Sequence, residues 1–126
     1  NFVFYDLFQH SIGSCSENEI AVAMACPVVS KYPRDRRLLI HGGAVHFSKE
    51  VLELDGRTVF GKGVAYLSYI SQEHGIIRDC PSGVFERIRI GDLLYLSPVH
   101  SCLTANLMGG YVTPEGKKIQ MQPRPE

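Results

Sequence analysis

A histidine and a cysteine separated by one serine are the residues of this sequence best suited to metal chemistry. His100 and Cys102 follow a predicted strand that ends at Pro98. In extended backbone, residues two apart point to the same side, so an imidazole nitrogen and a thiolate can converge on one ion. Zinc takes both kinds of ligand. Two protein ligands leave open positions for water or substrate, which is typical of a catalytic metal site.

The same spacing also has a purely structural interpretation. A histidine two residues before a cysteine is common by chance, so spacing alone favours His100 as a turn cap and Cys102 as a buried thiol. A hydrolytic nucleophile–base pair of Cys102 and His100 is a poor alternative. Neighbouring positions rarely give the required geometry, and no orienting acid is evident.

The segment Glu73-His74-Gly75 is the second candidate, because it closes a predicted strand at a glycine that permits a sharp turn. His74 either lies near an active-site mouth and orients a metal ligand, or is a solvated side chain in a surface turn. The sequence favours neither. The other histidines have no evident partners and are predicted to be structural: His10, His41 and His46. Near the start, Tyr5-Asp6 is predicted to contribute an aromatic anchor to the core.

Short strands with glycine, proline and aspartate turns must position these side chains. The apolar run 19–29 allows a helix capped at Ser16 with Glu19 three residues later, but Pro27 and the valines after it favour a strand. Gly116 suits the turn of a terminal hairpin. The predicted strands are 19–29, 37–41, 58–60, 63–70, 84–90, 93–97, 111–113 and 118–121. Their number and spacing predict an all-β fold, an antiparallel barrel or sandwich.

The bulk composition argues against several classes of protein. The 126 residues fit one domain that can bury a core without disulfides. Thirteen basic and thirteen acidic residues give zero net charge, which argues against nucleic acid as a partner, and no apolar run is long enough for a membrane span. The opening segment 2–5 resembles the middle of a structure, so we expect the natural start to lie upstream.

The four cysteines are widely spaced, which favours free thiols in a reducing compartment and therefore a cytoplasmic location. Three of them are predicted to act as partly buried small hydrophobic residues: Cys15, Cys26 and Cys80.

Four segments of the chain, in order, form a recognisable pattern. The most specific is 98–107, with the sequence PVHSCLTANL. The other three are Tyr5-Asp6, then Gly42-Gly43-Ala44-Val45 with Ser48-Lys49, then Gln72-Glu73-His74-Gly75 ahead of Ile90-Gly91-Asp92. Together they resemble the D-serine dehydratase / D-threonine aldolase-like family of alanine-racemase-like enzymes, which has the pattern P-x-H-x-C-x-T-x-N-L.

The resemblance implies a C-terminal β-domain that follows an α/β barrel binding pyridoxal phosphate. His100 and Cys102 would hold zinc beside that cofactor, where the metal binds the amino acid and helps to expel its β-hydroxyl. Aldolase relatives have aspartate in place of Cys102, so the resemblance favours a zinc-dependent, D-serine dehydratase-like lyase. Val99 departs from the asparagine of many relatives, which leaves the contacts around the site open.

The resemblance also implies the partners, namely a D-amino acid substrate, the barrel domain and a second copy in a homodimer. An α/β barrel takes about 250 residues, so this chain lacks one and is expected to be inactive alone. The alternatives are a relative of D-threonine aldolase or of amino acid racemases, or a non-enzymatic β-barrel interaction module. None of the lysines resembles the family's cofactor lysine: Lys31, Lys49, Lys62, Lys117 and Lys118.

Overall fold

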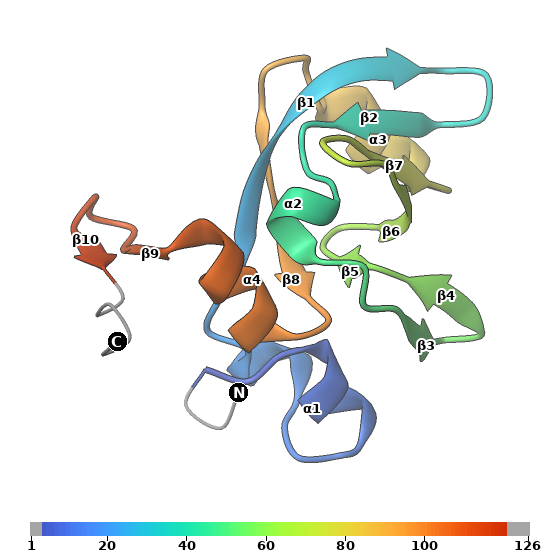
Figure 1. Cartoon of the computed structure of the whole chain (residues 1–126). Helices are drawn as coiled ribbons and strands as arrows, with labels where there is room; N and C mark the ends of the chain where they lie inside the picture. Colours follow the sequence, from blue (N-terminus) through green and yellow to red (C-terminus); the bar gives the residue numbers. More distant parts are fainter. Residues whose placement is uncertain (1–3, 121–126) are drawn as a thin grey trace.

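A closed antiparallel barrel lies at the centre of the computed structural model, which describes residues 4–120 (Figure 1). Neighbouring strands follow the order β1-β2-β7-β6-β5-β8, and β8 pairs with β1 to close the ring. The strands are β1 (Met24–Tyr32), β2 (Arg37–Ile40), β5 (Gly61–Lys62), β6 (Tyr66–Ile70), β7 (Gly75–Arg78) and β8 (Leu93–Pro98). The predicted all-β fold is confirmed, in its barrel form.

Small sheets and short helices surround the barrel. β3 (Leu52–Leu54) pairs with β4 (Arg57–Val59), and β9 (Gly110–Val112) pairs with β10 (Lys118–Gln120). The helices are α1 (Leu7–Ser11), α2 (Ala44–Phe47), α3 (Ser82–Arg87) and α4 (Ser101–Met108), with a 3₁₀ turn at Glu17–Glu19. No helix within residues 4–120 is long and apolar enough to cross a membrane.

The main core forms because alternate side chains of each barrel strand point inward. In β1, Met24, Cys26 and Val28 are buried, and the residues between them are exposed or half-buried. Cys15 is half-buried, as predicted, and Cys26 and Cys80 are buried more completely, in the main core. Burial raises the pKa of the Cys26 thiol to about 12, so this residue is a neutral core side chain at physiological pH.

A second core cluster joins the segments that matter for the site. Leu7 of α1 packs with Val99, which follows β8, and with Leu54 and Val59 of the β3–β4 pair. All four side chains are buried. Because complete burial of such a side chain stabilises a fold by about 1.5–3 kcal/mol, this cluster fixes α1 against the end of β8.

The segment 84–90 differs from its prediction, because residues 84–87 belong to α3 and residues 88–90 form no strand. Val84, Phe85 and Ile88 pack against the main core at the spacing of one helical face. The ammonium of Lys31 on β1 donates to the carbonyl oxygens of Phe85 and Ile88, at 2.8 and 2.5 Å. The barrel closes without a strand from this segment, so its apolar residues are buried by packing onto the barrel.

The first strand begins later and ends later than predicted. Ser16 and Glu19 do form the expected capping contacts, since the Glu19 carboxylate accepts from the backbone N–H and the hydroxyl of Ser16, both at 3.0 Å. They stabilise only a 3₁₀ turn, and β1 starts at Met24. The terminal hairpin is confirmed as β9–β10 with Gly116 at a φ of 89°; the predicted strand residue Met121 lies outside the described residues.

Candidate functional site

His100 and Cys102 lie at the junction of β8 and α4. β8 ends at Pro98, the buried Val99 follows, and His100 is the N-cap residue of α4 with a φ of −130° and a ψ of 102°. Cys102 belongs to the first helical turn. The backbone therefore does not stay extended from 100 to 102, and the prediction that both side chains project from one side of an extended segment is wrong.

A helix forms here because one face of the segment is buried. Thr104 and Ala105 follow Ser101 by three and four residues, the spacing of a single helical face, and all three side chains are buried. Gly109 ends the helix in the left-handed conformation, with a φ of 77°. This glycine after a run of small and apolar residues was the available sequence signal for α4.

Helix geometry gives His100 and Cys102 a different way to share a ligand. The side chain of an N-cap residue normally folds over the first turn, toward the second and third helical residues. Cys102 is the second helical residue, and the His100 side chain makes no capping hydrogen bond. His100 is half-buried and Cys102 is exposed, so both residues lie at one partly accessible end of α4.

The imidazole of His100 contains a buried nitrogen without a hydrogen-bond partner in the described part of the chain. This atom is Nδ1. The Phe8 ring lies against the imidazole, with ring centroids 5.9 Å apart. A buried polar atom without a partner costs about 1–3 kcal/mol, so the site suits a group from outside these residues. An imidazole beside a thiol is a donor set that favours zinc.

A complete set of metal ligands is not assembled within residues 4–120. No group of three or more histidine, cysteine, aspartate and glutamate side chains there is arranged to hold an ion. A metal at His100 and Cys102 would therefore take its remaining ligands from water, substrate or another part of the protein.

Asp6 contacts the same end of α4 and was missed by sequence reasoning as a site residue. Its side chain is buried, and its carboxylate accepts hydrogen bonds from the backbone N–H groups of Gln9 and Ser101, both at 2.9 Å. Tyr5 is half-buried and belongs to neither core cluster, so the prediction of an aromatic core anchor there is wrong. The buried group is the neighbouring carboxylate.

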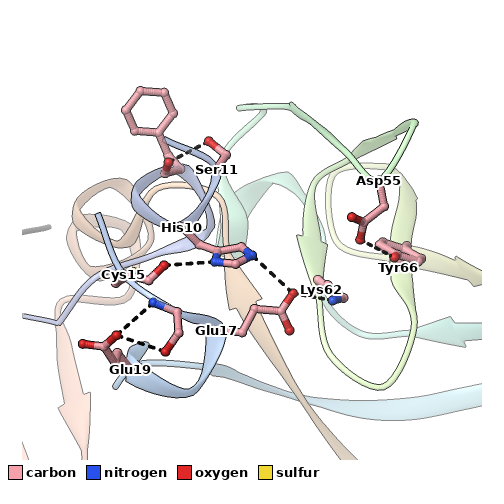
Figure 2. A network of polar contacts seen from close by, with 10 residues as sticks. His10, Ser11, Cys15, Glu17, Glu19, Asp55, Lys62 and Tyr66 are labelled. Atoms are coloured by element: carbon pink, nitrogen blue, oxygen red, sulfur yellow. Dashed lines mark hydrogen bonds and ion pairs between the residues drawn. The ribbon is translucent and has the colours of Figure 1, made fainter. Parts of the chain in front are cut away.

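A polar network fixes the segment that follows α1 (Figure 2). His10 Nδ1 lies 3.1 Å from the carbonyl oxygen of Cys15, and His10 Nε2 lies 3.7 Å from a Glu17 carboxylate oxygen. That oxygen also accepts from the Lys62 ammonium of β5 at 2.5 Å. The network therefore joins the α1 segment to the barrel wall, which agrees with the predicted structural role of His10, whereas the prediction that His10 lacks partners is wrong.

The structure places His74 beside two other histidines. Its ring centroid lies 5.5 Å from that of His41, and the His41 and His46 centroids lie 5.1 Å apart at an interplanar angle of 83°. The prediction that His41 and His46 lack partners is therefore wrong. The role of His74 in orienting a metal ligand stays a prediction; its ring contacts that of His41.

Two effects dominate the pKa of His46 in this cluster. Burial lowers the pKa of its imidazole below the ordinary value, and the nearby His41 lowers it further. The Glu73 carboxylate acts in the opposite direction. The Nδ1 atom of His46 accepts a hydrogen bond from the Gly43 N–H at 3.0 Å, so the neutral ring is part of the N-terminal cap of α2.

Comparison with solved structures defines the class of the fold, a β-domain of the alanine-racemase-like type. An alanine racemase-like protein from Idiomarina loihiensis matches 91% of this chain with a TM-score of 0.71 and 24% identity. D-threo-3-hydroxyaspartate dehydratase from Delftia sp. HT23 matches 94% with a TM-score of 0.73 and 22% identity. The match covers 34% and 36% of those chains, respectively.

The chain belongs to the family described as Putative serine dehydratase domain, whose model matches residues 21–113. It is 29% identical over 122 residues to D-serine dehydratase of Dictyostelium discoideum, and 26% identical over 116 residues to D-serine dehydratase of Saccharomyces cerevisiae. These alignments cover 88% and 82% of this chain but only 31% and 27% of the relatives. The predicted family is confirmed, and the chain spans about a third of the relatives' length.

Proposed function

We propose that this chain is the C-terminal β-domain of a lyase that depends on pyridoxal phosphate and zinc and removes water and ammonia from a D-hydroxy amino acid. The observation that carries the proposal is the buried Nδ1 of His100 at the start of α4, two residues before an exposed Cys102. Within the described residues this nitrogen has no hydrogen-bond partner. In a serine dehydratase domain, such a pair can bind a metal ion that contacts the substrate.

The solved structures of D-threo-3-hydroxyaspartate dehydratase support this choice of residues. One is a cysteine-to-alanine mutant in a metal-free form, and another is a histidine-to-alanine mutant. The two mutated positions are two residues apart, with the histidine first, as His100 and Cys102 are in this chain.

In the proposed reaction, His100 and Cys102 would hold the zinc ion and Phe8 would support the imidazole. Zinc bound there would supply positive charge to stabilise the leaving hydroxyl group. The thiolate favours zinc over magnesium or manganese because it is a soft ligand. Open coordination positions, which a two-residue donor set leaves, are required if the substrate is to reach the metal.

The proposal assigns pyridoxal phosphate to a barrel domain outside this chain. A cofactor-carrying lysine must be able to lose its proton. Lys31 donates to two backbone carbonyls. Burial lowers the pKa of Lys62, but the hydrogen bond to Glu17 and the negative charges nearby together outweigh burial, so the pKa is raised. Neither lysine suits the role.

The barrel domain and a second copy of the chain are the proposed protein partners, and the cytoplasm is the proposed location. Apolar side chains on the outer face of α4 support a covering partner: Leu103 is 37% exposed, Leu107 47% and Met108 48%. Exposed apolar side chains grouped on one helix are typical of a surface that another domain covers.

A cobalt titration tests the proposal, because Co2+ replaces zinc and a cobalt–thiolate bond gives a charge-transfer absorption band. We expect the band in the parent chain and in Cys15→Ala, a control that removes another incompletely buried thiol. We expect it to be lost in Cys102→Ala and strongly weakened in His100→Ala. A band that survives both site variants would show that the metal binds elsewhere and would overturn the proposal.

A further inference from the structure

The carboxylate of Asp6 connects two helices that lie far apart in the sequence. Asp6 is the N-cap residue of α1, where one carboxylate oxygen accepts from the Gln9 N–H. The other oxygen accepts from the N–H of Ser101, which lies 95 residues away in the first turn of α4. One side chain therefore caps the N-terminal turns of both helices.

Because Asp6 is completely buried, its carboxylate needs these hydrogen bonds. The Asp6 side chain is 0% exposed, and a buried carboxylate is tolerated only when hydrogen bonds replace its hydration. The first backbone N–H groups of a helix have no partners within the helix and carry the positive end of its dipole. Two such ends meet at Asp6, so its negative charge suits this position.

Ser101 is the residue between the two proposed metal ligands. A hydrogen bond to its N–H holds the peptide group that joins it to His100, and the next residue is Cys102. On the other side of His100, the carbonyl oxygen of Val99 accepts from the N–H of Phe8 at 3.2 Å. The Phe8 ring also contacts the His100 ring. α1 therefore touches the backbone before and after His100 as well as its side chain.

α1 is itself held firmly, which lets it act as a support. Leu7 is 1% exposed within the second core cluster, and the polar network of Figure 2 joins the following segment to β5. Figure 1 shows α1 lying at the end of the barrel from which β8 leads into α4. Asp6 thus connects the first turn of α4 to a segment that is itself fixed to the barrel wall.

Within residues 4–120, other buried polar atoms of α1 and α4 also lack a hydrogen-bond partner. Among the described residues, the buried side-chain atoms without a hydrogen bond include Gln9 Oε1 on α1 and Thr104 Oγ1 on α4, besides His100 Nδ1. Of these side chains, the Asp6 carboxylate is the one that makes a hydrogen bond from the α1 segment to the first turn of α4.

We infer that Asp6 is a positioning residue for the metal pair: it holds the first turn of α4 so that His100 and Cys102 face a common ion. The inference rests on the proposed function and deepens it. Replacement of a group that orients metal ligands typically weakens metal binding about tenfold to a hundredfold, and that is the effect expected of Asp6→Asn. Its amide has one acceptor oxygen and a donor group, so it cannot accept from both N–H groups in the same way.

The matched control is Asp92→Asn. The Asp92 carboxylate also accepts a hydrogen bond from a backbone N–H, that of Arg89 at 2.8 Å. Asp92 lies in an exposed turn just before β8, whereas His100 and Cys102 follow the other end of this strand. With Co2+ as the probe, we expect Asp6→Asn to weaken binding at least tenfold and to diminish the thiolate band, while Asp92→Asn behaves like the parent. Parent-like affinity and an unchanged band in folded Asp6→Asn would overturn the inference.

Hydrogen exchange of the Ser101 amide keeps the test decisive whether or not metal binds. In the parent chain this amide should be protected, and in Asp6→Asn it should exchange at least tenfold faster. Fast exchange in the parent overturns the inference even if Asp6→Asn fails to fold. If the parent gives no Cys102-dependent band, the proposed function fails, whereas the exchange comparison still decides whether Asp6 fixes this turn.

Discussion

At the scale of single residues, the pKa of His46 depends on the neighbouring His41 and Glu73 side chains. His46 accepts the Gly43 N–H through Nδ1 and contacts the ring of His41. Protonation at Nδ1 would remove the acceptor that caps α2. Burial and His41 both lower the pKa of His46, and Glu73 raises it, so the two neighbours can be told apart by the sign of their effects.

We predict that His41→Gln raises the pKa of His46 and that Glu73→Gln lowers it further. The titration of the His46 ring in NMR spectra measures both shifts, with the parent as reference. Because the folded pKa lies below the ordinary 6.5, the unfolded chain takes up this proton first as the pH falls. The stabilisation is present above about pH 6.5 and is lost as the pH drops through the folded pKa. Shifts of the same sign in both variants would contradict this account.

The choice of metal is also decided by one residue in our proposal. We predict that Cys102→Asp keeps a metal site but weakens zinc binding relative to manganese, because a carboxylate is a harder ligand than a thiolate. Competition between Zn2+ and Mn2+ in the parent and the variant measures the ratio of their affinities. An unchanged ratio would mean that Cys102 is not a ligand.

At the scale of elements, α2 is placed by a close approach of backbone to backbone. The N–H groups of Ala44 and Val45 donate to the carbonyl oxygens of Ser71 and Gln72, at 2.9 and 3.1 Å. A Cβ atom on Gly43 would lie 2.6 Å from the Ser71 oxygen and 2.7 Å from the Gln72 oxygen. Glycine is thus required here, and this contact also brings His46 toward the turn that carries His74.

We predict that Gly43→Ala destabilises the fold by about 1–3 kcal/mol, the usual cost of overpacking against atoms that cannot move aside. Gly83→Ala in α3 is the matched control. Its Cβ would meet no atom within 4 Å, and alanine in a helix is favoured over glycine by about 0.5–1 kcal/mol. Urea denaturation of both variants measures the difference, and equal stability would show that α2 adjusts freely.

At the scale of the whole molecule, our proposal gives this chain the metal ligands and assigns pyridoxal phosphate to a separate α/β barrel domain. We predict that the purified chain, supplied with zinc and pyridoxal phosphate, forms no pyruvate from D-serine. A coupled assay for pyruvate measures this outcome. Turnover that disappears in His100→Ala would show that the chain is sufficient for catalysis and would contradict the proposed division between two domains.

The sequence by itself determined the features that depend on neighbouring residues. The apolar run 93–97 after the Gly91-Asp92 turn and the glycine turn at Gly116 are local patterns, and the strand and the hairpin formed as predicted. The His100–Cys102 motif is equally local, because its chemistry follows from residue types and spacing. The family prediction rested on such segments, and the matched family model confirms it.

Tertiary structure decided whatever depends on which surface a segment buries. In residues 84–90, apolar and polar side chains alternate partly, as in a strand. The barrel closes without this segment, and its apolar side chains pack onto the barrel from α3 and the residue after it. Burial of Ser101, Thr104 and Ala105 turned an expected extended segment into α4. The contacts of Asp6 with Ser101 and of His41 with His74 join positions far apart in the chain, and only the tertiary fold brings them together; His41 and His74 meet because β2 pairs with β7.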